Sequence, residues 1–371
     1  MALLPGRRDN DAVKILVLLA LSALLGGCAS IDYYLQSIGG QMDVWRRERP
    51  IDDWLADPGT QDALKHKLAR VLEIRGFASR ELQLPENGSY RRYADLQRPY
   101  VVWNVFAAEE FSLEPKQSCF LFAGCVGYRG YFSHDDAERY AAGLRAQGLD
   151  VYVGGVPAYS TLGWFNDPVL NTFVGYPDTE LARIIFHELA HQLVYVKDDS
   201  VFNESFAVTV ENEGVRRWLD AHGDPAKRAA FDAAQRRRHE FLALMERYRH
   251  RLGALYKSEA AEQEKRAGKR AAFDAMLAEY RALKAQGGGY AGYDGIVGEQ
   301  PNNAALASVA IYTRFVPAFV ALLDAEQRDL ARFYAAVRDI GRLGKSERDA
   351  RLHALAPATG NGNGPVAATP R

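Results

Sequence analysis

The chain has 371 residues, of which 48% are hydrophobic and 25% are charged, a composition typical of globular proteins with one large domain or two ordinary ones. Its formal net charge is −1, so no excess of basic residues indicates a nucleic-acid partner. The Arg- and Lys-rich stretches of the second half carry interleaved acids, which argues against nucleic-acid binding there as well.

The N-terminus has the pattern of a secretory signal. Arg7, Arg8 and Lys14 precede a short apolar run, ILVLLALSALL at residues 15–25, and small residues follow it. A basic region, an apolar core and small residues before a cleavage point define such a signal. The run is too short to cross a bilayer as a helix, which takes about 20 residues. Residues 1–27 are therefore predicted to be removed.

The sequence Leu25-Gly26-Gly27-Cys28 resembles the lipobox of bacterial lipoproteins. The resemblance implies cleavage before Cys28 and lipidation of that cysteine, which anchors the protein to a membrane facing the periplasm. Ala29 follows the cysteine in place of an aspartate, and by the same resemblance this favours the outer membrane. An uncleaved anchor, or an ordinary signal with an incidental cysteine, is the alternative.

Residues 28–62 are rich in Trp, Arg and Asp and are expected to form a partly helical segment beside the membrane. A helix is predicted over DALKHKLARVLEIRGFASREL, because its apolar residues recur with a period close to 3.6. LPENGS breaks this helix, and PYVVWNVFAA has the composition of a buried strand.

Cys119 and Cys125 are the cysteines that remain if Cys28 is lipidated. In an oxidising periplasm this even pair can close a small loop as a disulfide. Two buried free thiols are the alternative. Zinc binding by these two alone is not expected, because a structural zinc site takes four ligands.

A capped helix is predicted from Ser133 to Gly148, followed by a strand over LDVYVGGVPAYST. The first half of the chain is therefore α+β. An extended peptide can add to the edge of a sheet, and the Gly154-Gly155 pair would let its backbone come close.

His187, Glu188 and His191 form an H-E-x-x-H motif within IIFHELAHQLV. Residues four apart share one face of a helix, so both imidazoles can bind one metal ion while Glu188 lies beside the first. Zinc peptidases use this arrangement, with the glutamate acting on a metal-activated water. The surroundings are apolar, and buried imidazole and carboxylate groups need a partner. Zn²⁺ is the predicted partner; a core helix whose histidines bind backbone carbonyls is the alternative.

A second helix is expected next, with Ser200 as its cap. Its NESFA, residues 203–207, resembles the NEGFA of aminopeptidase N and its relatives, in which the glutamate completes the zinc site. The resemblance implies Glu204 as third ligand beside His187 and His191, with water in the fourth position. The spacer of twelve residues between His191 and Glu204 is shorter than in that group.

Glu211 lies seven residues beyond Glu204, on the same helical face. It matches an acidic residue of the same group and is a candidate for orienting a ligand histidine; a capping or surface carboxylate is the alternative. Glu213 is expected to point elsewhere.

Several longer stretches extend the resemblance over most of the mature chain. They look like a family of bacterial lipoproteins described as predicted aminopeptidases. The resemblance implies a gluzincin-type zinc peptidase with a peptide substrate. The stretches are LPENGSYRRYADLQRPYVVWNVFAAEEFSLEP, GCVGYRGYF, DVYVGGVPAYSTLGWFNDP and FHELAHQLVYVKDDSVFNESFA.

The second half is expected to be nearly all helical. Residues 224–286 are predicted to form a long helical hairpin, and residues 287–355 a Gly/Tyr-rich loop followed by closing helices. NAALASVAIYTRFVPAFVALL reads as an apolar helix that bends or ends near Pro317. Residues 356–371 form a low-complexity tail that is expected to be disordered.

Peptide hydrolysis of this kind needs a donor for the developing oxyanion besides zinc. Tyr290, Tyr293 and Tyr312 are candidates, and the first two lie on a glycine-rich loop suited to closing over a substrate. For each of them, aromatic packing is the alternative role.

The sequence thus predicts a lipid-anchored zinc aminopeptidase in which Glu188 is the general base. Its expected α+β fold places a sheet against a zincin-type helical core within residues 63–223, before a mostly helical C-terminal half. A GAMEN-type motif, which holds the free amine in aminopeptidase N, is absent. The alternatives are a zinc endopeptidase and a zinc-binding envelope lipoprotein without catalysis.

Overall fold

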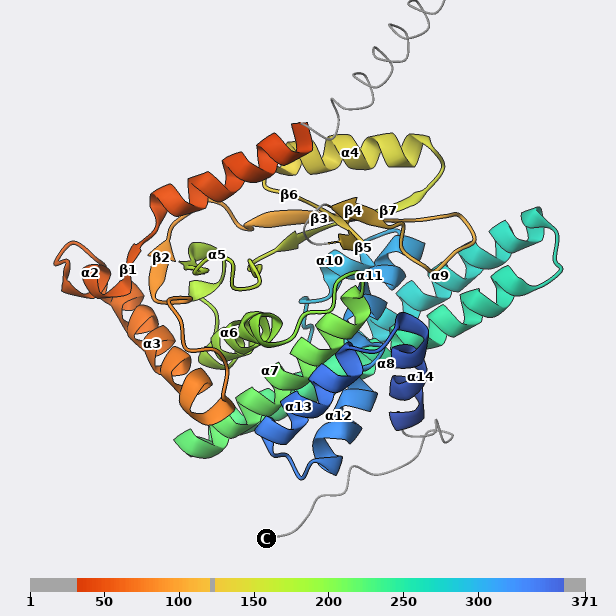
Figure 1. Cartoon of the computed structure of the whole chain (residues 1–371). Coiled ribbons are helices and arrows are strands. Elements are labelled where there is room, and N and C mark those ends of the chain that lie inside the picture. The colour runs from red at the N-terminus through yellow and green to blue at the C-terminus, as the bar shows by residue number, and fades with distance from the viewer. Residues whose placement is uncertain (1–31, 121–123, 357–371) are drawn as a thin grey trace, which may run out of the picture.

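A computed structural model of the chain describes residues 32–120 and 124–356. The predicted signal at residues 1–27, Cys28, and residues 357–371 of the predicted tail lie outside the described residues. The described chain is α+β: small sheets belong to the N-terminal half and helices make up the C-terminal half (Figure 1). The predicted fold class is confirmed to this extent.

The N-terminal half begins with a helix over residues 32–47 and alternates between helices and short strands. Helix α3 has the bounds that the apolar period predicts. The elements are β1 (Arg49–Pro50), α2 (Ile51–Ala56), α3 (Asp62–Leu82), β2 (Arg92–Ala94), β3 (Val102–Ala108), β4 (Ser118–Phe120), β5 (Gly124–Val126), β6 (Arg129–Tyr131), α4 (His134–Ala146), β7 (Asp150–Val156), β8 (Val169–Leu170) and α5 (Asn171–Val174).

The strand β3 lies at the centre of an antiparallel sheet of order β6-β3-β7. Side chains alternate between the two faces of a strand. Val105 therefore packs in the cluster that includes α4, while Phe106 packs on the other face against residues of the later helix α11. The outer edge of β7 pairs with no other described strand.

Two long helices, α6 (Asp178–Leu193) and α7 (Ser200–His222), pack against each other at the centre of the molecule (Figure 1). Their close approach depends on Gly214, because a Cβ there would lie 2.6 Å from the ring of Phe186. α3 covers α6, and α12 (Val316–Ala325), α13 (Leu330–Gly341) and α14 (Lys345–Leu355) of the C-terminal half complete the same hydrophobic core. This helix pair carries the predicted metal ligands.

The C-terminal half is helical, as predicted. α8 and α9 form an antiparallel hairpin that projects from the body of the molecule (Figure 1). The elements are α8 (Pro225–Lys257), α9 (Glu262–Gln286), α10 (Asp294–Val297), α11 (Asn303–Thr313), α12 (Val316–Ala325), α13 (Leu330–Gly341) and α14 (Lys345–Leu355).

The apolar stretch before Pro317 is interrupted, as predicted: α11 ends at Thr313 and α12 begins at Val316. By length and composition alone, Asn303–Ala325 is apolar enough to cross a membrane. Both halves nevertheless pack against α7, and the amide of Phe315 between them donates a hydrogen bond of 3.1 Å to Ser205. In the folded chain this stretch is therefore part of the core.

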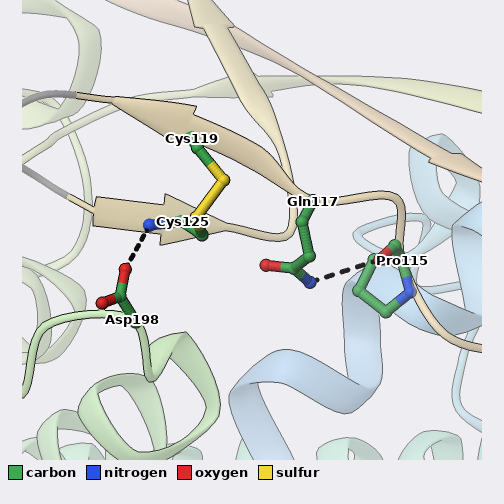
Figure 2. The surroundings of a disulfide bond; sticks show 5 residues. All are labelled: Pro115, Gln117, Cys119, Cys125 and Asp198. Carbon is green, nitrogen blue, oxygen red and sulfur yellow. Dashed lines mark hydrogen bonds between the residues drawn. A yellow bond between two sulfur atoms is a disulfide. The ribbon is translucent and has the colours of Figure 1, made fainter.

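Cys119 and Cys125, the pair for which the sequence favours a bridge, form a disulfide across the β4–β5 hairpin (Figure 2). The amide of Cys125 donates a 2.6 Å hydrogen bond to Asp198, in the turn between α6 and α7. A Cβ at Gly124, whose φ is +77°, would collide with the same aspartate. The hairpin is thereby fastened to the turn that joins the two central helices.

Candidate metal centre

The turn between α6 and α7 is closed by polar side chains from α7. Asn203 accepts a 2.7 Å hydrogen bond from the amide of Val196 and donates one of 2.8 Å to its carbonyl. Asp199, rather than the expected Ser200, caps α7 by accepting from the amide of Phe202. These bonds satisfy backbone groups that a helix end leaves open, and they fix the register of α7 relative to α6.

His187, His191 and Glu204 meet at this junction. Nε2 of His187 lies 3.2 Å from Nε2 of His191 and 3.1 Å from Oε2 of Glu204, and the third distance, from His191 to Glu204, is 3.6 Å. Donor atoms bound tetrahedrally to zinc at about 2.0–2.1 Å lie about 3.3–3.4 Å from one another. The three atoms therefore already have the spacing of three corners of a zinc tetrahedron.

Glu211 lies behind His187. Its Oε2 is 2.8 Å from Nδ1 of the ring, and the side chain is fully buried. An ionised carboxylate can only accept a hydrogen bond, so Nδ1 carries a hydrogen, and Nε2 can offer its lone pair to a metal once the proton that it shares with Glu204 is lost. This is the role that the sequence comparison suggests for Glu211.

The charges of the cluster also suit a cation. Burial opposes ionisation of Glu204 and of Glu211, but the neighbouring histidines, and for Glu211 also Arg183 and Arg238, lower the pKa of each carboxyl to about 2. Burial also disfavours a charged His187, but its bonds to the two carboxylates raise its pKa to about 10. The cluster thus takes up positive charge readily, and a divalent metal can supply the charge that a proton on His187 otherwise supplies.

Neither histidine bonds to a main-chain carbonyl of the described residues, which is the arrangement that a purely structural core helix would need. Nδ1 of His191 is buried and has no hydrogen-bond partner in the described part of the chain. Both imidazoles turn their Nε2 atoms inward to the same point. The donor set therefore fits a metal ion.

Glu188 lies next to this point on α6. Burial raises its pKa, the nearby His187 and His191 lower it, and Glu204 and Glu211 raise it further, with a net upward shift. A carboxylate with a raised pKa is a stronger base than an ordinary one, which suits Glu188 to accept a proton from water.

The candidate tyrosines divide into two groups. Tyr312, on α11, is partly buried, and desolvation together with the charges of Glu204 and Glu188 raises its pKa well above the usual value. Burial and the charges of the same two carboxylates also raise the pKa of Tyr128. Tyr290 and Tyr293 lie farther out: Tyr293 stacks on a phenylalanine of α8, and its pKa responds to charges other than those of the cluster.

A cavity of about 410 Å³ adjoins the cluster. Arg183 and Arg238 line it, and their side chains contact Glu211 at 3.4 and 3.0 Å. Tyr312 lines it as well, as do Tyr290 and Tyr293. The three predicted ligands are not part of the lining, so the cavity adjoins the metal-binding atoms through these arginines and Tyr312.

Residues 32–352 match the model of the family described as "Putative aminopeptidase". The chain belongs to this family. No curated protein and no solved structure matches it significantly. Membership in the aminopeptidase family supports peptidase activity and a peptide substrate.

Several residues in or beside the cluster of this aminopeptidase family member are not evident from its sequence. Asn203 is part of the NESFA motif, yet its role in closing the turn needs the folded helix pair. Arg183 lies four residues before His187, and this spacing alone could have placed the two side chains on one face of the helix. Arg238 and Tyr128 come from distant segments, and no local pattern marks them. Glu213, as expected, faces away and pairs with Arg216, Arg217 and Arg328.

Proposed function

We propose that the chain is a zinc metallopeptidase that removes residues from the amino end of peptides. The observation that carries the proposal is the triangle formed by Nε2 of His187, Nε2 of His191 and Oε2 of Glu204. In this proposal α6 and α7 are a zincin-type core of the gluzincin kind. The family match supports the peptidase class, and the donor set supports the metal.

The residues of the chain have distinct roles in this proposal. When bound, zinc lowers the pKa of a water molecule and polarises the peptide carbonyl. Glu188 accepts the proton of the attacking water and delivers it to the leaving amine. Glu211 holds the ring of His187. Of the three predicted tyrosines, Tyr312 is proposed to donate to the carbonyl oxygen as negative charge develops on it, because it lines the cavity and its pKa responds to the charges of Glu204 and Glu188.

Replacing Glu188 with Gln tests this mechanism. The amide keeps the size of the side chain but cannot accept the proton, so hydrolysis should fall by at least about a hundredfold. Zinc content should remain that of the wild type, because the three ligands are unchanged. Unchanged turnover of Glu188→Gln would contradict the proposed mechanism.

Two other functions have support. The missing GAMEN-type motif favours an endopeptidase, which would cleave N-acetylated peptides as fast as free ones, whereas an aminopeptidase would not. The projecting α8–α9 hairpin suits a zinc-binding envelope protein without catalysis. Such a protein would bind zinc and cleave no peptide, and Glu188→Gln would change nothing.

We further propose that lipidation of Cys28 places the enzyme on the outer membrane, facing the periplasm. A surface feature supports attachment to a bilayer. Leu35, Ile38, Met42 and Trp45 recur along one side of the helix over residues 32–47 and are 38–62% exposed. This exposed apolar stripe begins seven residues after Cys28. Tryptophan and aliphatic side chains on one helix face are typical of helices that lie in a membrane interface.

A further inference from the structure

The cavity beside the cluster is lined by residues of strand β7 and of helix α8. Gly154 and Gly155 of β7 line it on one side, and the outer edge of β7 pairs with no other strand among residues 32–120 and 124–356. An extended peptide can bind such an edge through main-chain hydrogen bonds. The volume, about 410 Å³, falls within the roughly 300–1,000 Å³ of small-ligand sites, so there is room for a short peptide.

Three arginines also line this cavity, and two of them are neutralised. Arg183 donates to Glu180 at 2.7 Å and lies 3.4 Å from Glu211. Arg238 lies 3.0 Å from the other oxygen of Glu211. The third, Arg237, forms no ion pair with any carboxylate of the described chain, and its Nε is buried without a hydrogen-bond partner. The cavity therefore carries one uncompensated positive charge.

Arg237 is also held in place. Its guanidinium lies over the ring of Tyr290, 4.9 Å from the ring centre, and Tyr290 packs edge-on against Tyr293. A planar guanidinium fixed by an aromatic ring loses little freedom when it binds a planar carboxylate through two hydrogen bonds. The glycine-rich loop thus positions a vacant anion-binding group.

We infer that the cavity binds a carboxylate of the peptide substrate through Arg237, so that the enzyme prefers short, acidic or free-C-terminal peptides. This inference rests on the proposed peptidase function. Tyr290 is then a positioning residue for Arg237. The carboxylate can be the C-terminal group of a short peptide or the side chain of an aspartate or glutamate, and both have the same chemistry.

Kinetic comparison of matched peptides separates these sources. Trialanine and trialanine amide differ only at the C-terminus, whereas Ala-Ala-Asp amide and Ala-Ala-Asn amide differ only in a side chain. In one of these two pairs, we expect the peptide with the carboxylate to have a KM at least about tenfold below that of its neutral partner. A difference of this size is typical of a hydrogen-bonded ion pair. Arg237→Gln should abolish this difference by raising the KM of the acidic peptide with little effect on kcat.

Two further variants complete the design. Arg237→Lys keeps the charge and should retain part of the preference. Arg236→Gln removes an exposed arginine that does not line the cavity, and it should behave as the wild type. If the wild type does not distinguish the members of either pair, or if Arg237→Gln keeps the preference, the inference is wrong.

A binding measurement keeps this inference separate from the proposed function. Calorimetric titration of the chelator-treated wild type with the same four peptides reports the cavity without turnover. Preferential binding of a carboxylate peptide, lost in Arg237→Gln, would support the inference even if the zinc-loaded protein cleaved nothing. Equal binding within both pairs would overturn it even if all four peptides were cleaved.

Discussion

Oε2 of Glu211 lies 2.8 Å from Nδ1 of His187, and this contact joins the two central helices at the predicted metal ligands. The same carboxylate contacts Arg183 and Arg238 on the cavity wall. One buried side chain therefore links the ring that would bind the metal to two arginines that line the cavity.

Replacing Glu211 with Gln should lower zinc affinity by about 10- to 100-fold, the usual effect of removing the partner of a ligand histidine. The reason is that the neutral amide oxygen of glutamine is a weaker acceptor for the Nδ1 hydrogen of His187 than the carboxylate of Glu211. Zinc affinity is measured by competition with a chelator of known strength. Glu213→Gln is the matched control: this buried carboxylate on the same helix contacts only arginines, so its loss should reduce stability without changing zinc affinity.

Acid should destabilise the metal-free protein through Glu204 and Glu211. Their pKa values are lowered from an ordinary 4.5 to about 2 in the folded state. The unfolded chain therefore takes up protons first, and the stability that these carboxylates contribute is present above about pH 4.5 and is lost as pH falls toward about 2. Urea unfolding between about pH 5 and pH 3 should show a smaller loss for Glu211→Gln than for the wild type. Equal losses of stability in the two proteins would contradict the role given to the Glu211 carboxylate.

Removal of the disulfide should reduce stability by about 2 kcal/mol, because the bridge closes a short loop. The double substitution Cys119→Ser and Cys125→Ser leaves the backbone bond to Asp198 possible, so zinc affinity should stay within a few-fold of the wild type. Urea unfolding measures the loss. Chemical reduction of the disulfide in the wild type should cause the same loss of stability. An unchanged unfolding midpoint in both the double variant and the reduced wild type would refute a stabilising role of the disulfide.

The exposed apolar stripe should bind lipid without the help of an anchor. The chain from Ala29 onward, which lacks both the predicted signal and Cys28, is expected to co-sediment with phospholipid vesicles, and changing Leu35, Ile38 and Met42 to Ser should release it. Because apolar burial rather than charge drives this binding, high salt should not displace the protein. Vesicle binding that survives the triple substitution would exclude the stripe as the contact.

Local patterns predict the elements of this fold well. The bounds of α3 follow from its apolar period, and α11 ends before Pro317, as a missing backbone donor requires. His187 and His191 share a helical face, so their convergence also follows from local geometry. Only the resemblance to aminopeptidase N predicts Glu204 as a metal ligand. In the structure, the hydrogen bonds of Asn203 that close the turn hold Glu204 beside the two histidines.

Long-range packing decides what the sequence does not predict. Tyr312 approaches Glu204 because α11 packs between α7 and the central sheet. Arg237 faces the cavity because of how α8 packs against the rest of the chain. Tyr290 and Tyr293, predicted as oxyanion donors, lie beside Arg237, and their catalytic role stays a prediction. None of these neighbours can be read from spacing along the chain.

Metal analysis of the wild type and of Glu204→Gln tests the central claim most directly. The account predicts one zinc ion per chain in the wild type, and loss of that ion in Glu204→Gln while circular dichroism shows the helices intact. A wild type that binds no zinc when supplied with it, or a Glu204→Gln protein that holds zinc as tightly as the wild type, would contradict the account.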